Sequence, residues 1–258
     1  ALDYYENAIA INNKPAKYYV NRGAALLKLM RIEEAAESYQ QALARDNNLA
    51  EAHYNLSICE LLKGNFTEGF AHYEWRLRVG APAGMSPPRA VEGPRWEGQA
   101  APDKTLLLVS EQGLGDSVQF IRFAALAARR VGRVVVEVQP RLKPLFQSIP
   151  DIEVFAAGEK LPAHDFHAPL MSLPHLLGIT LEQLPAAPTP YLQVDDARIA
   201  KWHAIMSAKP GVRVGIRWQG NPNAKVDFGR SIALKMLAPL AAIPGVRLIS
   251  LQKDEGAD

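Results

Sequence analysis

The stretch AAESYQQALARDN at residues 35–47 decides the first fold, because related stretches occur on either side of it, ALDYYENAIAINN at 1–13 and GFAHYEWRLRVGA at 69–81. A small residue and an aromatic residue hold the same places in each copy, 34 residues apart: Ala1, Ala35 and Gly69, and Tyr5, Tyr39 and Tyr73. Self-similarity at this period is typical of helix pairs that stack into a solenoid. The repeat therefore predicts a helical array over residues 1–79.

This array resembles the tetratricopeptide repeat (TPR) family at its signature positions, which are occupied by Tyr19, Gly23, Leu26, Ala35, Tyr39 and Ala42. The sequence departs from the family at Asn47, where proline is usual, and at Gly69 and Arg76 in the last repeat. Ala1 falls at the start of a second helix, so we expect the chain to begin inside a longer array. The resemblance implies a concave surface that binds a protein or peptide, and the alternative is a spacer or a dimerisation arm.

The composition narrows the class of protein. The 258 residues are enough for two domains, and 29 basic against 27 acidic residues leave a net charge of +2. A net charge this small does not create an electrostatic field that would attract a nucleic acid, which argues against such a partner. Cys59 is the single cysteine, which excludes a disulfide within the chain and favours a reducing compartment. No apolar run approaches the roughly 18 residues that span a bilayer, so we expect a cytoplasmic protein without a transmembrane segment.

The pattern changes after the repeats. Residues 80–103 are rich in proline and glycine without a period, which predicts a linker. From Lys104, strand-like and helix-like runs alternate, which predicts a parallel sheet with helices on both faces. The expected strands are Thr105–Val109, Arg133–Val138, Ile152–Phe155, Phe166–Ala168, Val212–Trp218 and Val246–Leu251. The expected helices are Ser117–Arg130, Arg141–Ile149, Asp195–Ser207 and Ile232–Ile243.

These elements predict a Rossmann-like domain over residues 104–208 and the beginning of a second one over 209–258. Two strands and one helix do not make a complete domain, so we expect the chain to be truncated at this end as well. The alternative is that the strands after Val212 extend the first sheet.

The first strand is followed by a loop with the sequence EQGLGD, residues 111–116, and then by a helix. Glycines at this place let backbone N–H groups approach an anion. The sequence lacks the Gly-Lys-Ser/Thr of a P-loop, and Val118 stands where a dinucleotide fingerprint needs its third glycine. Glu137 lies where a ribose-binding acid belongs, which keeps a dinucleotide oxidoreductase open. Asp116 is a candidate for catalysis or simply for capping the helix.

Several further motifs follow in order. They are Trp96-Glu-Gly, Leu106–Phe123, Asp165–Pro174, Pro190-Tyr-Leu, Val214–Pro222 with Arg230-Ser-Ile, and Ser250–Lys253. Together they resemble bacterial TPR-linked glycosyltransferases that are similar to heptosyltransferase-type (family 9) GT-B enzymes. The resemblance covers about residues 70–258 and implies two Rossmann-like domains that face a cleft. In this family the first domain binds the acceptor and the second mostly binds a nucleotide-sugar.

The resemblance also implies roles for individual residues. Asp116 would be the general base of an inverting transfer that needs neither a metal nor a cofactor, because the nucleoside diphosphate of the nucleotide-sugar donor is already a good leaving group. Candidates for binding substrate or phosphate are Gly113, Gly115, Gln112, Gln119, His167, Gly220, Asn221, Arg230 and Ser231. A structural helix face explains Gln112 and Gln119 nearly as well. The spacing of His164, His167 and His175 fits no standard metal site. The alternative function is a TPR interaction module with a non-catalytic α/β domain.

Overall fold

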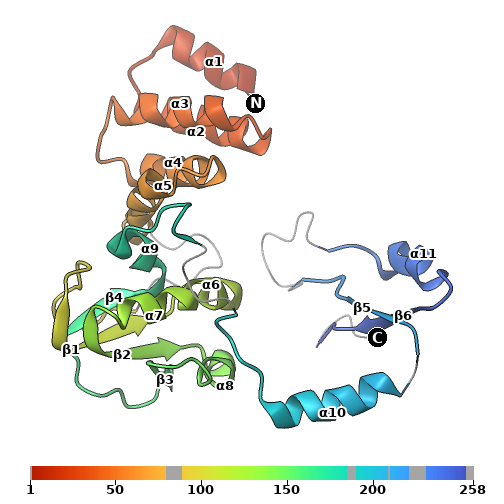
Figure 1. Cartoon of the computed structure of the whole chain (residues 1–258). Helices are drawn as coiled ribbons and strands as arrows, with labels where there is room; N and C mark the ends of the chain where they lie inside the picture. Colours follow the sequence, from red (N-terminus) through yellow and green to blue (C-terminus); the bar gives the residue numbers. More distant parts are fainter. Residues whose placement is uncertain (1, 80–88, 185–189, 209, 221–230, 254–258) are drawn as a thin grey trace. The chain divides into compact units, whose positions relative to one another are not determined.

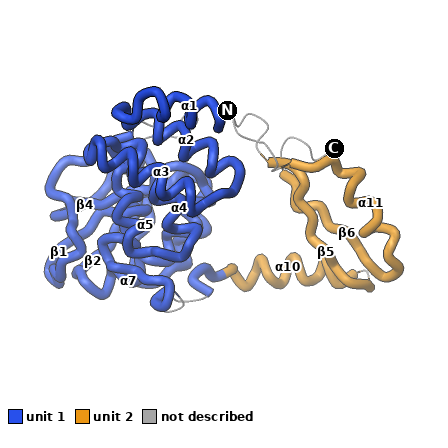
Figure 2. The backbone as a smooth tube through the Cα atoms, turned by 90° about the horizontal axis from the view of Figure 1, so that it is seen from above, with its two compact units in different colours: residues 1–193 blue, residues 194–258 orange. Residues whose placement is uncertain are grey.

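The computed structural model describes residues 2–79, 89–184, 190–208, 210–220 and 231–253 (Figure 1). The chain divides into two compact units, residues 1–193 and 194–258 (Figure 2). The first unit contains the helical repeats and a four-stranded sheet, and the second contains a two-stranded sheet. The predicted combination of a helical array with a parallel α/β sheet is confirmed. The domain limits drawn from the sequence remain predictions.

The repeats form helices that stack in chain order (Figure 1). The helices are α1 (Leu2–Ile11), α2 (Ala16–Lys28), α3 (Ile32–Leu43), α4 (Ala50–Leu62) and α5 (Phe66–Tyr73), and a 3-10 turn (Glu74–Leu77) continues the last. Gly23 of α2 faces Tyr39 of α3, and a Cβ atom at Gly23 would lie 2.7 Å from the ring. A small residue is therefore needed where these two helices meet, which is the physical reason for the repeat pattern.

The sheet of the first unit is entirely parallel, with the strand order β3-β2-β1-β4. The strands are β1 (Ala101–Val109), β2 (Val131–Val138), β3 (Glu153–Ala156) and β4 (Phe166–Pro169). The short helices that follow them are α6 (Leu114–Phe120), α7 (Ala124–Ala127), α8 (Lys143–Phe146) and α9 (Leu173–Leu177), with 3-10 turns at Ile121–Phe123, Pro140–Leu142 and Leu170–Ser172. Leucine and valine side chains of β1 and β2 fill the core on both sides, as a continuous apolar run predicts.

One face of this sheet is covered by helices and the other is not. Leu106 and Leu108 pack in the main core with residues of α6, α7 and α9. On the opposite face, Leu107 and Val109 pack with Val91 and Leu161, which lie in loops. We expected helices on both faces, and within the described residues of the first unit the second face is covered by irregular segments instead.

The predicted linker ends earlier than the sequence indicated. The strand β1 begins at Ala101, not at Thr105, because the backbone N–H of Ala101 donates to the carbonyl of Arg130 and Ala101 pairs with Val131. Before it, Trp96 is completely buried, and its backbone N–H donates to the carbonyl of His167. Part of residues 80–103 is therefore integral to the sheet. The start of the strand was not predicted because Asp103 and Lys104 are polar and do not continue the apolar run.

Three expected helices also differ. The helix predicted at Ser117–Arg130 starts at Leu114 and is interrupted by the turn at Ile121–Phe123. The one predicted at Arg141–Ile149 has only four α-helical residues, Lys143–Phe146, after a 3-10 turn that begins with a proline. The one predicted at Ile232–Ile243 is a 3-10 turn, Leu234–Leu237, followed by α11 (Ala238–Ala241), which has a proline in its first turn.

The last repeat shares its core with the sheet. Phe70 of α5 belongs to the same cluster of buried side chains as Trp96 and Leu108. Its ring meets the ring of Phe120 of α6 edge to face, with 6.3 Å between the centroids. The last repeat and the sheet therefore share one hydrophobic core within the first unit.

The second unit contains α10 (Asp196–Ser207), β5 (Val212–Ile216), α11 and β6 (Val246–Ser250). The strands β5 and β6 are parallel and pair from Val212–Val246 to Ile216–Ser250. Among the described residues of this unit, Trp218 alone is buried, at 8% exposure. The unit thus has strands that pair but almost no closed core.

Candidate functional site

The predicted loop lies at the carboxyl end of β1 and leads into α6. Glu111 is buried, Asp116 is half-buried, and Gly113 is exposed. The backbone N–H of Gly113 donates to Oδ2 of Asp116 over 2.9 Å, which closes the loop on itself. Gln112 has a φ of 60°, in the left-handed region that residues other than glycine rarely adopt. The structure thus brings Gln112, Gly113 and Asp116 together in one tight turn.

Residues of α5 and of the 3-10 turn after it bind this loop. Arg76 binds Glu111 with two hydrogen bonds, Nη2 to Oε1 at 2.5 Å and Nε to Oε2 at 3.2 Å. The side chains of Arg76 and Glu111 are only 4% and 1% exposed. Tyr73 accepts a hydrogen bond from Nε2 of Gln112 through its hydroxyl, at 3.2 Å. Two consecutive loop residues are therefore fixed by the array.

Further polar groups complete the contact. Nη1 of Arg76 lies 2.8 Å from Oε1 of Glu74, and Nη2 lies 3.0 Å from Oγ of Ser172. Ser172 in turn donates to Oε2 of Glu74 at 3.0 Å, and Arg95 binds the same carboxylate oxygen at 3.1 Å. We call Tyr73, Glu74, Arg76, Arg95, Glu111, Gln112 and Ser172 the repeat–loop junction.

Electrostatics agree with this geometry. Burial by itself lowers the pKa of Arg76, but Glu111 and Glu74 outweigh it and raise that pKa above the usual value. Burial likewise acts to raise the pKa of Glu74, and Arg76, Ser172 and Arg95 together lower it. Burial raises the pKa of Tyr73 to about 12. Arg76 is therefore kept protonated, Glu74 ionised and Tyr73 neutral, as their hydrogen bonds in the junction require.

The array also brings Tyr54 of α4 toward the loop. Burial raises the pKa of the Tyr54 hydroxyl, Arg76 opposes this effect, and the charge of Asp116 adds to it. The rings of Tyr54 and Tyr73 are 5.8 Å apart between centroids. Tyr54 lies within electrostatic reach of the predicted base, and nothing in the sequence singled it out for this.

Gln139 is a second residue that the sequence did not indicate. It follows β2, accepts a hydrogen bond from Ser117 at 3.0 Å, and donates to the carbonyl of Gln112 over 3.4 Å. Its signal was its position, since polar residues directly after neighbouring parallel strands meet at one edge of the sheet. Gly115 and Gln119 are both exposed, and a Cβ atom at Gly115 would meet nothing within 4 Å.

His167 lies apart from the loop. It pairs with Leu107 in the register of β4 and β1, and therefore shares the face of Leu107 and not that of Leu106 and Leu108. Its Nε2 atom is 3.1 Å from the carbonyl oxygen of Gly93, and burial lowers its pKa. The structure does not bring His167 into the turn with Asp116.

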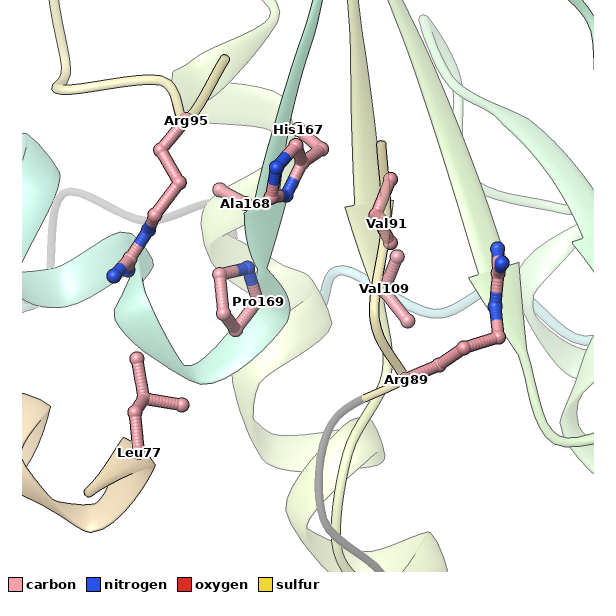
Figure 3. Close-up of a pocket in the computed structure, with 8 residues that line it drawn as sticks. All are labelled: Leu77, Arg89, Val91, Arg95, Val109, His167, Ala168 and Pro169. Carbon is pink, nitrogen blue, oxygen red and sulfur yellow. The ribbon is translucent and has the colours of Figure 1, made fainter. Parts of the chain in front are cut away.

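His167 lines a small cavity of about 110 Å³ (Figure 3). The other lining residues are Leu77, Arg89, Val91, Arg95, Val109, Ala168 and Pro169. The two arginine head groups lie at opposite sides of it, where they bind Glu137 at 2.7 Å and Glu74 at 3.1 Å. The cavity is therefore mostly apolar and much smaller than an ordinary ligand pocket of roughly 300 Å³ or more.

The pairing of Arg89 bears on the dinucleotide interpretation. Glu137 is the residue that would bind the ribose of a dinucleotide. It is buried and accepts two hydrogen bonds from Arg89, at 3.0 and 2.7 Å. The carboxylate of Glu137 is therefore already paired with a cation of this chain, the half-exposed Arg89.

In the second unit, Gly220 and Ser231 come together. The backbone N–H of Gly220 donates to Oγ of Ser231 at 3.0 Å, and Gln219 and Gln252 exchange two further hydrogen bonds, at 3.2 and 3.3 Å. Asn221 and Arg230 lie outside the described residues, so their proposed roles remain predictions. Gln252 belongs to this loop although it was not among the predicted site residues.

The described residues contain neither a candidate metal site nor a helix that could span a membrane. No group of three or more histidine, cysteine, aspartate or glutamate side chains is arranged to hold a metal ion. Among the same residues, no helix has both the length and the apolar character required to cross a membrane.

Known proteins are similar either to nearly the whole chain or to the part with the repeats. No family model matches. Protein FlbA of Caulobacter vibrioides is 29% identical over 279 aligned positions, which cover 98% of this chain and 46% of FlbA. The human DnaJ homolog subfamily C member 7 is 38% identical over 65 residues, which cover 25% of this chain and 13% of that protein. The chain thus spans about half the length of FlbA, and a TPR-containing bacterial protein is supported.

Solved TPR structures are similar to a part of the chain. The Arabidopsis OM64 TPR domain is 26% identical with a TM-score of 0.30, covering 31% of this chain and 66% of that one. YrrB, described as a TPR protein with an unusual peptide-binding site, is 28% identical with a TM-score of 0.30, covering 32% of this chain and 42% of that one.

Proposed function

We propose that this chain is part of a glycosyltransferase that moves a sugar from a nucleotide-sugar to a protein acceptor held by the TPR-like array. The observation that carries the proposal is the position of Asp116. It stands in the first turn of α6, directly after the loop at the carboxyl end of β1 that the last repeat binds through Tyr73 and Arg76. A polypeptide on the array would therefore lead to this carboxylate. The ordered motifs and the similarity to FlbA over 98% of this chain support an architecture of repeats followed by this α/β region.

The proposed reaction needs one free carboxylate oxygen of Asp116 as the base. Asp116 accepts the Gly113 N–H on Oδ2, and its Oδ1 atom accepts no hydrogen bond from the described part of the chain. Oδ1 is then available to take the proton of an acceptor hydroxyl. The hydroxyl oxygen attacks the anomeric carbon from the side opposite the nucleoside diphosphate, which leaves with the bonding electron pair, so the configuration inverts.

The leaving diphosphate needs donors and cations to stabilise its developing charge. In the proposed enzyme these groups come from the loop of the second unit, with Gly220 and Ser231 together and with Asn221 and Arg230 as the remaining candidates. No metal takes part in this scheme, so we expect transfer to persist in the presence of EDTA.

The test compares Asp116→Asn with Asp103→Asn in the natural full-length protein. Asp103 is an exposed aspartate near the other end of β1 and serves as the control. Transfer is measured with UDP-, GDP- and dTDP-linked sugars, chosen by a thermal-shift screen in which a ligand at 100 times its Kd adds about 2.7 kcal/mol. Loss of general base catalysis should lower kcat by about 10² to 10⁴ in Asp116→Asn only. Full activity of Asp116→Asn would overturn the proposed role.

A second function is favoured by a specific contact. The hydrogen bond from Gly113 to Asp116 closes the first turn of α6, which gives Asp116 a purely structural role. On this view the chain is a TPR interaction module, and its α/β region only supports the array. It predicts that no nucleotide-sugar stabilises the full-length protein and that Asp116→Asn lowers stability without affecting binding of a protein partner.

A further inference from the structure

The last repeat differs from the earlier copies at the position of Arg76. Ala8 and Ala42 occupy this place in the earlier copies, and Ala42 is completely buried in the core of the array. The third copy has Arg76, which is almost as deeply buried. An arginine placed where alanine packs is costly unless its charge is paired and its hydrogen bonds are made. The substitution therefore points to a partner outside the array.

That partner is the loop with Asp116. Arg76 makes its two-pronged contact with Glu111, which is 35 positions away in the sequence and buried as well. Glu74 and Arg95 add one charge of each sign, so two arginines face two glutamates. Bidentate pairs of this kind fix orientation as well as distance.

The contacts then run along the loop without a gap. Glu111 is held by Arg76, and the next residue, Gln112, donates to Tyr73 while its backbone adopts the left-handed conformation. The following N–H, that of Gly113, donates to the Asp116 carboxylate. A strained residue persists only when its surroundings determine its conformation, and here the surroundings include Tyr73 of the repeat and Gln139 after β2.

We propose that Arg76 is a positioning residue, which sets the conformation of residues 111–116 from the last repeat and thereby orients the Asp116 carboxylate. The effect on loop conformation stands by itself, and the consequence for sugar transfer rests on the proposed function. The junction makes the end of the array a part of the site and not a neighbouring module.

The experiment uses hydrogen exchange of the full-length protein. Arg76→Met leaves Glu111 buried without a cation, and we expect the amides of residues 112–117 to exchange about 100-fold faster. The control is Arg133→Met, which breaks an exposed pair with Glu153 of 2.6 Å on the same sheet and should leave these amides within about threefold of the wild type. The double variant Arg76→Met/Glu111→Met, which leaves no charge unpaired, should recover much of the protection.

Arg76→Lys serves if Arg76→Met does not fold. Lysine keeps the charge but lacks the planar fork, so an intermediate exchange rate is expected. Loop amides in Arg76→Lys or Arg76→Met that exchange within threefold of the wild type would overturn the proposal.

Kinetics separate this inference from the proposed function. If Arg76 positions the base, Arg76→Lys lowers kcat and leaves the KM of the nucleotide-sugar unchanged, because the donor loop lies elsewhere in the chain. Faster loop exchange combined with an active Asp116→Asn enzyme would remove the proposed base and leave the positioning role intact. If Asp116→Asn is inactive but the loop of the Arg76 variants exchanges as in the wild type, the proposed base is kept and the positioning role of Arg76 is lost.

Discussion

The strand pairs β1–β2 and β5–β6 are built alike but are surrounded differently. Both are parallel, and both consist largely of valine, leucine and isoleucine. In the first unit, Leu106–Leu108 and Val134–Val136 are at most 1% exposed. In the second unit, no residue of β5 or β6 is buried.

The difference shows that strand pairing and burial have separate causes. A β-type run is enough to predict a parallel pair, but side chains are buried only where other elements cover both faces. The loop after β1 therefore stands on a closed core and is held by buried charges. After β5, the hydrogen bonds between described residues are those that join Gln219 to Gln252 and Gly220 to Ser231.

The largest expected effect compares two leucines in the paired strands. Leu108→Ala removes a fully buried side chain and should cost about 2–5 kcal/mol of unfolding free energy. Leu248→Ala in β6 removes a side chain that is only half-buried and should cost about 1 kcal/mol. Urea unfolding followed by hydrogen exchange of peptides from each unit gives both values. Equal costs would break the comparison.

A second contrast uses two strand glycines. A Cβ atom at Gly132 of β2 would lie 2.2 Å from the carbonyl oxygen of Pro102, and backbone in a packed sheet does not yield. Gly132→Ala should cost about 1–3 kcal/mol or more.

The matched variant is Gly215→Ala in β5. Its Cβ atom would lie 2.7 Å from the end of the Leu251 side chain, which is 61% exposed and free to turn away. We expect a change within about 0.5 kcal/mol in thermal unfolding. A large loss of stability in this variant would mean that β5 is packed as tightly as β2.

A third contrast concerns two serines that hold the loops. Ser172→Ala removes hydrogen bonds to Arg76 and Glu74 inside the junction and should cost about 1.5–3 kcal/mol, because both partners are charged. Ser231→Ala removes one bond to the Gly220 N–H and should cost about 0.5–1 kcal/mol. Chemical denaturation of both variants tests this, and the reverse order would contradict the assigned roles.

The smallest effect is a pH dependence. The pKa of Glu74 is lowered in the folded protein, so its pairing stabilises the fold above the ordinary value of 4.5 and is lost as the pH falls below it. Glu74→Gln should therefore flatten the loss of stability between pH 6 and pH 3. The control is Glu153→Gln. Arg133 also lowers the pKa of Glu153, but this pair is exposed and screened by water, so its removal should alter the profile less. Identical profiles would argue against the buried junction.

Much of the fold followed from local patterns. The 34-residue period predicted the helix pairs, and the small residue at Gly23 is explained by its contact with Tyr39. The strands near Thr105 and Arg133 were predicted within a few residues because of their runs of leucine and valine, and the short strand at Phe166 was predicted to within one residue. The start of β1 was missed, since Ala101–Lys104 has no strand character and pairs only because Val131 lies beside it.

The site was less accessible to prediction. The EQGLGD sequence predicted a loop that leads into a helix with Asp116 near the helix start, and in the structure Asp116 lies in the first turn of α6, with Gly113 at the N-cap. The role of Arg76 was not predicted, because in the sequence it was only a departure from the repeat. Its partner Glu111 is recognised only when α5 and β1 are brought together, and such pairing depends on the tertiary fold. Asn221 and Arg230 remain predictions from the motif alone.

Finally, the buried Arg76–Glu111 pair bears on how such a protein arises by recombination. A sheet domain transferred to a foreign repeat array would carry Glu111 into its core without a counter-ion, and Phe120 without Phe70. Earlier repeats, which pack only on one another, are free to be duplicated or lost. We therefore expect a fusion of this sheet to a foreign array to be tolerated when the seam lies before α4, so that the last repeat stays with the sheet, and not when it lies after the array.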